Sequence, residues 1–194
     1  MFSDTIAALA TPPGRSALAV VRLSGRDAFV VAARVIPTFT AVPPRTAHLA
    51  AFVGGDGTLI DRGLYTVFPG PNSYTGEDLV EFSCHGGLVV PVRLVSALLA
   101  TGARAALPGE FTRRAVMHGR MDLLQAEAVG ELIDATAPAQ ARQAPHQPVL
   151  ADQERVLVDL VHHVERGAGP APQTVGLLLD HDPRQRVVGH ERRP

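Results

Sequence analysis

The densest group of chemically capable residues lies at 69–87, with the sequence PGPNSYTGEDLVEFSCHGG. This segment, called the signature segment below, holds a Pro-Gly-Pro-Asn turn, the acid pair Glu77-Asp78 and a Cys-His-Gly-Gly exit. Between them runs a short apolar strand that carries one carboxylate, Glu81. Turn-forming residues fix the backbone on both sides of that strand. We therefore interpret the segment as a preorganised binding loop.

Glu81 stands between Val80 and Phe82, so strand alternation places its carboxylate on the face opposite to these two apolar side chains. A carboxylate there can pair in a bidentate manner with a guanidine-like donor edge, such as that of a pterin or guanine ring. The alternative is a solvated strand face. Arg22 lies near the end of the apolar strand expected at 17–23 and can hold a ligand carboxylate, or form an ordinary rim charge.

Cys84 and His85 are the residue types of a nucleophile and its base, but adjacent side chains of a strand point to opposite faces. The chain has no second cysteine to form a redox pair. We therefore predict no catalytic dyad, and expect His85 to shape the loop or to pack at the edge of a pocket. The Asp-His-Asp cluster at 180–182 lacks suitably spaced partner ligands, so we predict no metal site there.

The composition limits the class of function. A chain of 194 residues that is 46% hydrophobic can form one domain with a real core, plus an appendage. The net charge of −1 argues against broad nonspecific binding to nucleic acid. All 18 basic residues are arginine, and a P-loop requires lysine, so this chain cannot bind a nucleotide through a P-loop. A single cysteine, no signal peptide and no long apolar run predict a cytoplasmic protein without membrane spans.

The elements that must position these residues follow from periodicity and turn signals. Strands are predicted at 5–10, 17–23, 46–53, 59–68, 79–84 and 104–107. Helices are predicted at 24–36, with Ser24 as its N-cap, and at 88–100, 110–118 and 122–135. Because strands and helices mix without strict βαβ alternation, we predict an α+β fold with a mixed sheet and packed helices, followed by a partly helical, poorly ordered tail.

Three of these helices carry further expectations. For the helix at 88–100 the predicted buried stripe is Leu88, Val92, Val95 and Leu99. For the helix at 122–135 the predicted buried residues are Leu123, Leu124, Ala128, Leu132 and Ile133. Asp122 and Gln125 have the spacing of a capping box at the start of that helix. Glu110 and Arg114 have the spacing of an intrahelical pair or a solvated face.

Five blocks of the sequence, in order, resemble a known family. They are DTIAALATPPG at 4–14, VRLSG at 21–25, FPGPNSYTGEDLVEFSCHGG at 68–87, PGEFTRRA at 108–115 and MDLLQAEAVGELIDA at 121–135. Over roughly residues 4–144 the chain resembles the N-terminal portion of the tRNA-modification GTPase MnmE (TrmE) family. The resemblance implies a folate-binding, aminomethyltransferase-like and dimerising domain at 1–120, and the start of a helical region at 121–166 that is atypical after 144. A tail follows at 167–194, and the GTP-binding domain is absent.

The resemblance also implies a ligand and partners. The family domain binds 5-formyltetrahydrofolate, and its folate contacts fall here on Arg22, Glu81 and Arg120. Glu81 would accept hydrogen bonds from the pterin donor edge, and the two arginines would offer cationic donors to polar or anionic parts of the folate. With the flavoprotein MnmG, the family protein installs a (carboxymethyl)aminomethyl-type group on the wobble uridine of certain tRNAs. We therefore expect a homodimer that meets MnmG and contacts tRNA only indirectly.

The first hypothesis is thus a folate-binding and dimerisation module that has no GTPase activity of its own. One alternative is an independent folate-dependent one-carbon transferase, for which Glu77, Asp78 and His85 are the conspicuous acid or base candidates. The other is a truncated relic that folds or dimerises but binds nothing. His118, where asparagine is usual in the family, lies beside the expected folate contact at Arg120.

Overall fold

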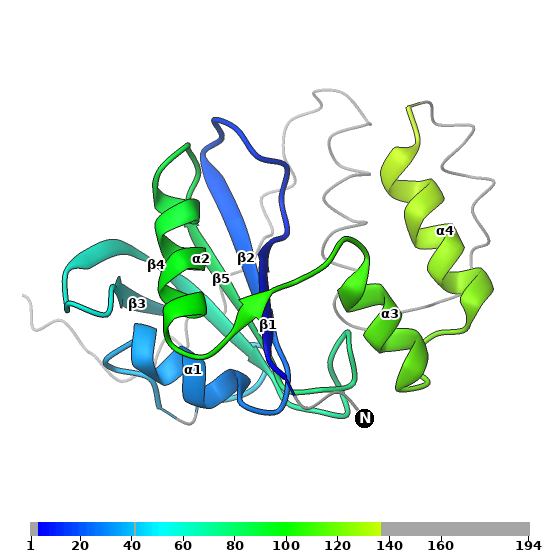
Figure 1. The fold of residues 1–194 in the computed structure, drawn as a ribbon, viewed down its shortest axis with the longest axis horizontal. Helices are drawn as coiled ribbons and strands as arrows, with labels where there is room; N and C mark the ends of the chain where they lie inside the picture. The colour runs from blue at the N-terminus through cyan, green and yellow to red at the C-terminus, as the bar shows by residue number, and fades with distance from the viewer. Residues whose placement is uncertain (1–3, 41, 137–194) are drawn as a thin grey trace, which may run out of the picture. The chain divides into compact units, whose positions relative to one another are not determined.

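The computed structural model describes residues 4–40 and 42–136 (Figure 1). The elements are β1 (Ile6–Leu9), β2 (Leu18–Ser24), α1 (Ala28–Val35), β3 (His48–Val53), β4 (Leu59–Phe68), β5 (Leu79–His85), α2 (Val90–Ala100), β6 (Arg104–Ala105), α3 (Glu110–Met117) and α4 (Leu123–Asp134). This mixture of strands and helices confirms the predicted α+β class. The predicted boundary between 166 and 167, the tail and the cluster at 180–182 lie outside the described residues.

The six strands form one mixed sheet in the order β3-β4-β5-β2-β1-β6. All neighbours pair antiparallel except β1 and β6, which pair parallel. The strands β2 and β5 pair along their whole lengths, which places Arg22 directly opposite Glu81. In the same row across the sheet, Ala8 of β1 is paired with Arg22, and Thr66 of β4 is paired with Glu81. Two of the predicted site residues therefore lie side by side at the centre of the sheet.

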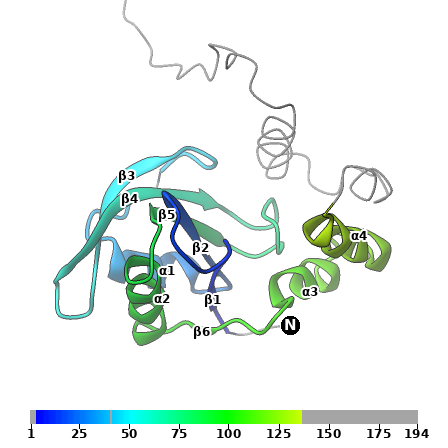
Figure 2. The ribbon, with the colours of Figure 1, turned by 90° about the horizontal axis from the view of Figure 1, so that it is seen from above.

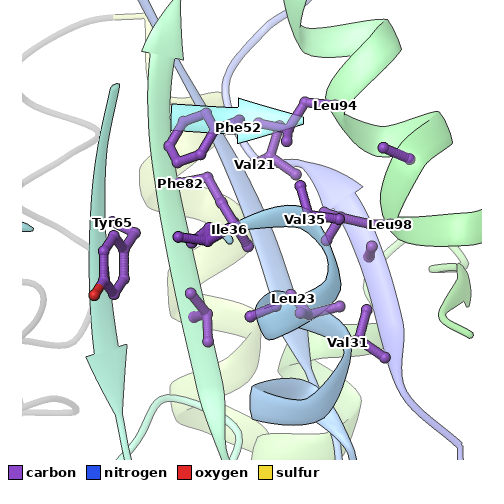
Figure 3. Close-up of a cluster of buried hydrophobic side chains, with 14 of the residues drawn as sticks. Val21, Leu23, Val31, Val35, Ile36, Phe52, Tyr65, Phe82, Leu94 and Leu98 are labelled. Atoms are coloured by element: carbon purple, nitrogen blue, oxygen red, sulfur yellow. The ribbon is translucent and has the colours of Figure 1, made fainter. Parts of the chain in front are cut away.

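The helices α1 and α2 cover one face of the sheet (Figure 2). Alternate residues of β2 and β5 point into this core, among them Val21, Leu23 and Phe82 (Figure 3). The rings of Phe52 and Phe82 meet edge to face, with centroids 5.5 Å apart. Full burial of such a side chain contributes about 1.5–3 kcal/mol. Because β-strand side chains alternate, burying these residues turns the intervening side chain, Arg22, to the second face of the sheet.

Helix α1 begins later than predicted. Ser24 was expected to cap it, but Ser24 is the last residue of β2 and the helix is preceded by Asp27. The reason is the strand ladder, which pairs Ser24 with Leu79 of β5 before Gly25 turns the chain at a φ of +142°. The Ser24 hydroxyl is buried and is hydrogen-bonded to the Thr75 hydroxyl at 2.7 Å.

The buried face of α2 also differs from the prediction. Leu88 and Val92 are 64% and 60% exposed, and the buried residues of the helix are Pro91, Leu94, Ala97 and Leu98. Val95 and Leu99 of the predicted stripe are partly buried against the core. This helix is apolar around most of its circumference, so periodicity alone does not select the side that the sheet covers.

Helix α4 begins with the predicted capping box, in which Asp122 and Gln125 exchange two hydrogen bonds of 2.8 Å. The predicted buried face is wrong. Ala128 alone of the five predicted residues is buried, and Leu123, Leu124, Leu132 and Ile133 are exposed. Within residues 4–40 and 42–136 nothing covers these four side chains. No helix in this part of the chain is long and apolar enough to cross a membrane.

Candidate functional site

Arg22 and Glu81 form an ion pair on the second face of the sheet. The Nε and Nη2 atoms of Arg22 donate to the same Glu81 oxygen, Oε1, at 3.0 and 2.7 Å. The two side chains are 18% and 23% exposed, and Val80 and Phe82 are fully buried on the opposite face. The predicted alternation of Glu81 with its apolar neighbours is therefore confirmed. The carboxylate is held near the surface, where a planar group with a pair of N–H donors can reach it.

Two aromatic rings flank the Arg22 guanidinium. Its Cζ atom lies 5.1 Å from the ring centroid of Tyr74, in the signature segment, and 5.8 Å from that of Phe111, in α3. The Tyr74 hydroxyl is hydrogen-bonded to the Thr112 hydroxyl at 2.8 Å, which joins the segment to the helix. The sequence analysis did not single out these rings, although both lie within the family-like blocks. Ring faces beside a cation and a carboxylate suit a flat, hydrogen-bonding heterocycle.

Arg120, the third predicted contact, lies close to the signature segment. Its Nε atom donates to the Ser73 carbonyl at 3.0 Å. The Nδ1 atom of His118 must donate to the Thr75 carbonyl at 2.7 Å, because a carbonyl oxygen can only accept. A Cβ atom added at Gly76 would lie 2.9 Å from the Cβ of His118 and 3.3 Å from the Cγ of Arg120. Arg120 and His118 thus pack on the segment, and among the described residues no hydrogen bond or ion pair joins Arg120 to the Arg22–Glu81 pair.

Sequence reasoning missed a second group of charged residues, the Arg114 cluster, composed of Arg114, Asp4, Glu77, Glu110 and Arg104. Arg114 has no exposed surface and donates to Asp4 Oδ1 at 2.8 Å, to Glu77 Oε2 at 3.0 Å and to Glu110 Oε1 at 3.1 Å. Arg104 pairs with Asp4 and Glu110 at 2.5 Å each. Only the Glu110–Arg114 pairing was expected, because the other partners are far apart in the sequence.

Because of this cluster, we expect the folded domain to lose stability in acid. The hydrogen bond from Arg104 is the largest influence on Glu110 and lowers its pKa from 4.5 to about 2. A depressed pKa stabilises the fold above the unfolded value, near 4.5, and that stability is lost as the pH falls toward 2. We expect the free energy of unfolding to fall by roughly 2 kcal/mol. This value is smaller than the full pKa shift implies, because Arg104 is exposed and solvent screens its charge. Urea unfolding at pH 5 and pH 3 measures it, and a Glu110→Gln chain with an equally steep pH dependence would contradict the assignment.

Cys84 and His85 are held apart. Cys84 is buried, whereas the His85 ring is exposed and bonds Asp61 Oδ1 through Nδ1 at 2.8 Å. Asp61 also accepts from the His85 backbone N–H at 2.8 Å, so this pair ties β5 to β4. The arrangement provides no thiol and imidazole in contact.

Burial is the largest influence on the Cys84 thiol and raises its pKa to about 11, with the negative charge of Asp61 acting in the same direction. We therefore expect alkylation by iodoacetamide at mildly alkaline pH to be at least about 100-fold slower in the folded chain than in concentrated guanidinium chloride. Mass spectrometry of timed samples measures both rates. Equal rates would show that the thiol is accessible in the native state.

The acid and base candidates of the transferase alternative have structural partners. Glu77 belongs to the Arg114 cluster, and Asp78 accepts from the Gly70 backbone N–H at 2.9 Å. His85 is paired with Asp61. No group of three or more His, Cys, Asp or Glu side chains in the described ranges is arranged to hold a metal ion.

The region that carries the candidate site matches a known protein family. The sequence model of the family described as "GTP-binding protein TrmE N-terminus" matches residues 5–120. The chain is 51% identical over 144 residues to the tRNA modification GTPase MnmE of Dechloromonas aromatica, an alignment that covers 74% of this chain and 32% of that protein. It is 42% identical over 185 residues to the MnmE of Acinetobacter baylyi, and 47% identical over 172 residues to that of Salinibacter ruber.

These last two alignments cover 92% and 84% of this chain, and 40% and 37% of the relatives. The similarity therefore continues past residue 144, beyond the motifs on which the resemblance was based. The chain spans between about a third and two fifths of the length of these relatives. The family match over more than half of the chain, on a fold that brings the family-like blocks together, shows that the chain belongs to the TrmE N-terminal family of tRNA-modification proteins.

Proposed function

We propose that this chain is a folate-binding module of the tRNA wobble-uridine modification system and that it positions 5-formyltetrahydrofolate or a related tetrahydrofolate. The observation that carries the proposal is the Arg22–Glu81 pair between the rings of Tyr74 and Phe111. Membership of the family supports it.

The hydrogen-bonding groups of the candidate site fit a pterin ring. A pterin presents adjacent N–H and NH₂ donors in the arrangement of a guanidine, and Glu81 already accepts two N–H bonds from the guanidinium of Arg22. The partly buried ring of Phe111 offers apolar surface to a flat heterocycle, whereas the ring of Tyr74 is buried in the neighbouring core cluster. Arg22 and Arg120 would offer cationic donors to polar or anionic parts of the folate.

The roles of this chain's residues are binding and orientation. Glu81 would fix the plane of the pterin, and the two arginines would donate hydrogen bonds to polar or anionic groups of the ligand. The folate, when bound, supplies a one-carbon unit. GTP hydrolysis and the full tRNA modification belong to longer proteins of the family, so here they would require other domains and the flavoprotein MnmG.

A homodimer in the cytoplasm is part of the proposal. Leu18, Leu49 and Leu64 are 64%, 74% and 42% exposed and lie on the same sheet face as Arg22 and Glu81. Exposed apolar side chains gathered on one face are typical of an interaction surface. Sedimentation equilibrium of the purified chain tests this part, and a monomer at all concentrations would exclude it.

The experiment that tests the function is calorimetric titration of the purified, folded chain with 5-formyltetrahydrofolate. Saturable binding supports the module. No binding by a chain that is folded by circular dichroism supports the relic alternative instead. Release of the one-carbon unit to an added amine acceptor, with no other protein present, would favour the transferase alternative.

A further inference from the structure

We propose that Arg114 is a positioning residue of the candidate site, which holds the rings of Tyr74 and Phe111 on the Arg22 guanidinium. Arg114 does not contact Arg22 or Glu81 in any bond described above. It acts through the two segments that carry the rings. As far as it concerns a ligand, this inference rests on the proposed folate-binding function.

Along the chain, the links made by Arg114 lie close to the two rings. Phe111 precedes Arg114 by three residues, and both belong to α3. Tyr74 precedes Glu77 by three residues in the signature segment. The Arg114–Glu77 ion pair, with Nη1 at 3.0 Å from Oε2, therefore joins the carriers of the two rings.

The strand that carries Arg22 also contacts Glu77. The hydroxyl of Ser24, two residues after Arg22 in β2, donates to Glu77 Oε2 at 3.2 Å and is hydrogen-bonded to the Thr75 hydroxyl. Glu77 thus receives bonds from β2 and from α3 at once. A shift of Glu77 would move Tyr74 relative to Arg22.

Arginine is the residue type that suits this position. A fully buried guanidinium is costly to desolvate, and the cost is offset only when its donors are matched by acceptors. The planar fork of Arg114 reaches Asp4, Glu77 and Glu110, which lie on three separate segments. A lysine ammonium is a compact point charge and cannot span the three acids in the same geometry. Arg114→Lys is therefore the informative substitution.

Arg104 provides a matched control within the same cluster. It bonds Asp4 and Glu110, as Arg114 does, but the structure records no bond from Arg104 to Glu77. Arg104→Lys thus perturbs the same two acids without cutting the link to the signature segment. The contrast between the two variants separates the Glu77 link, together with the Arg114 bond to the Asp4 carbonyl, from the contacts with the two shared acids. Glu77→Ala then tests the Glu77 link alone.

The test uses Tyr74 as a reporter. The chain has two tyrosines and no tryptophan, so a Tyr65→Phe background leaves Tyr74 as the single tyrosine. In that background we expect Arg114→Lys to lose most of the tyrosine near-ultraviolet circular dichroism, and Arg104→Lys to keep it, with unchanged far-ultraviolet spectra in both. Loss in both variants, or in neither, would overturn the proposal. This measurement needs no ligand, so its result does not depend on whether the chain binds folate.

Titration with 5-formyltetrahydrofolate adds the functional readout. We expect Arg114→Lys to raise the Kd about tenfold and Arg104→Lys to leave it within about twofold. If Arg114→Lys does not fold, Glu77→Ala takes its place, since it leaves Arg114 with Asp4 and Glu110. A folded Glu77→Ala chain that keeps the Tyr74 signal would refute the positioning role. Absence of binding in the unsubstituted chain would instead refute the proposed function.

Discussion

Replacing Glu81 with glutamine is expected to weaken the binding of 5-formyltetrahydrofolate by about 100-fold while the domain stays folded. The carboxylate can accept from both donors of a guanidine-like edge, whereas the amide presents one acceptor and one donor group. Hydrogen bonds to a charged group contribute about 1.5–3 kcal/mol each, and about 2.7 kcal/mol corresponds to the stated change in Kd. Arg22 loses the negative charge of its partner, but it can still donate to the amide oxygen and it keeps the neighbouring rings.

Calorimetric titration of the wild-type and Glu81→Gln chains, side by side, measures this effect. Glu131→Gln makes the same chemical change at an exposed position of α4 and is the control, expected to bind as the wild type does. Equal affinity of the Glu81→Gln chain would show that the pterin edge is recognised elsewhere, even if the domain binds folate.

Replacing Gly25 with alanine is expected to destabilise the domain by about 3 kcal/mol or more. Gly25 has a φ of +142°, which L-residues rarely adopt, and an added Cβ would lie 2.6 Å from the Cα of Thr5 and 2.7 Å from the carbonyl oxygen of Asp4. That carbonyl accepts a hydrogen bond from Arg114 at 2.9 Å. The substitution would therefore strain the turn after β2 and push the segment before β1 away from the Arg114 cluster.

Urea unfolding followed by circular dichroism gives the change in the free energy of unfolding. Gly55→Ala is the matched control, because an added Cβ there has no neighbour within 4 Å and the backbone is not in the positive-φ region. Its effect should stay within about 0.5 kcal/mol. A Gly25→Ala chain as stable as the control would mean that the segments before β1 and after β2 do not approach so closely.

Local patterns allowed the strands and most helix limits to be predicted. The alternation of Val80, Glu81 and Phe82 put the carboxylate on the correct side of β5, and the spacing of Asp122 and Gln125 indicated the capping box. Such features depend on neighbouring residues alone, so they can be read along the chain. The family assignment has the same origin, because ordered blocks of sequence carry it.

The faces of the apolar helices could not be predicted in the same way. Leu124 and Ile133 have the apolar character of core residues, yet they are 70% and 77% exposed in the part of the chain that the structure describes. A hydrophobic stripe indicates that burial of its side chains is favourable, but it does not indicate which element covers them. For the same reason, the prediction of a buried stripe on α2 was wrong at Leu88 and Val92.

By itself, the sequence determined the α+β class, the exclusion of a P-loop and the presence of Arg22 and Glu81 in family-like blocks, with Arg120 directly before the last block. Only the tertiary structure decided that Arg22 lies opposite Glu81 and that Arg114 joins distant acids in one buried cluster. The physical reason is that strand register and packing set the contacts between residues far apart in the chain. No local periodicity encodes those distances.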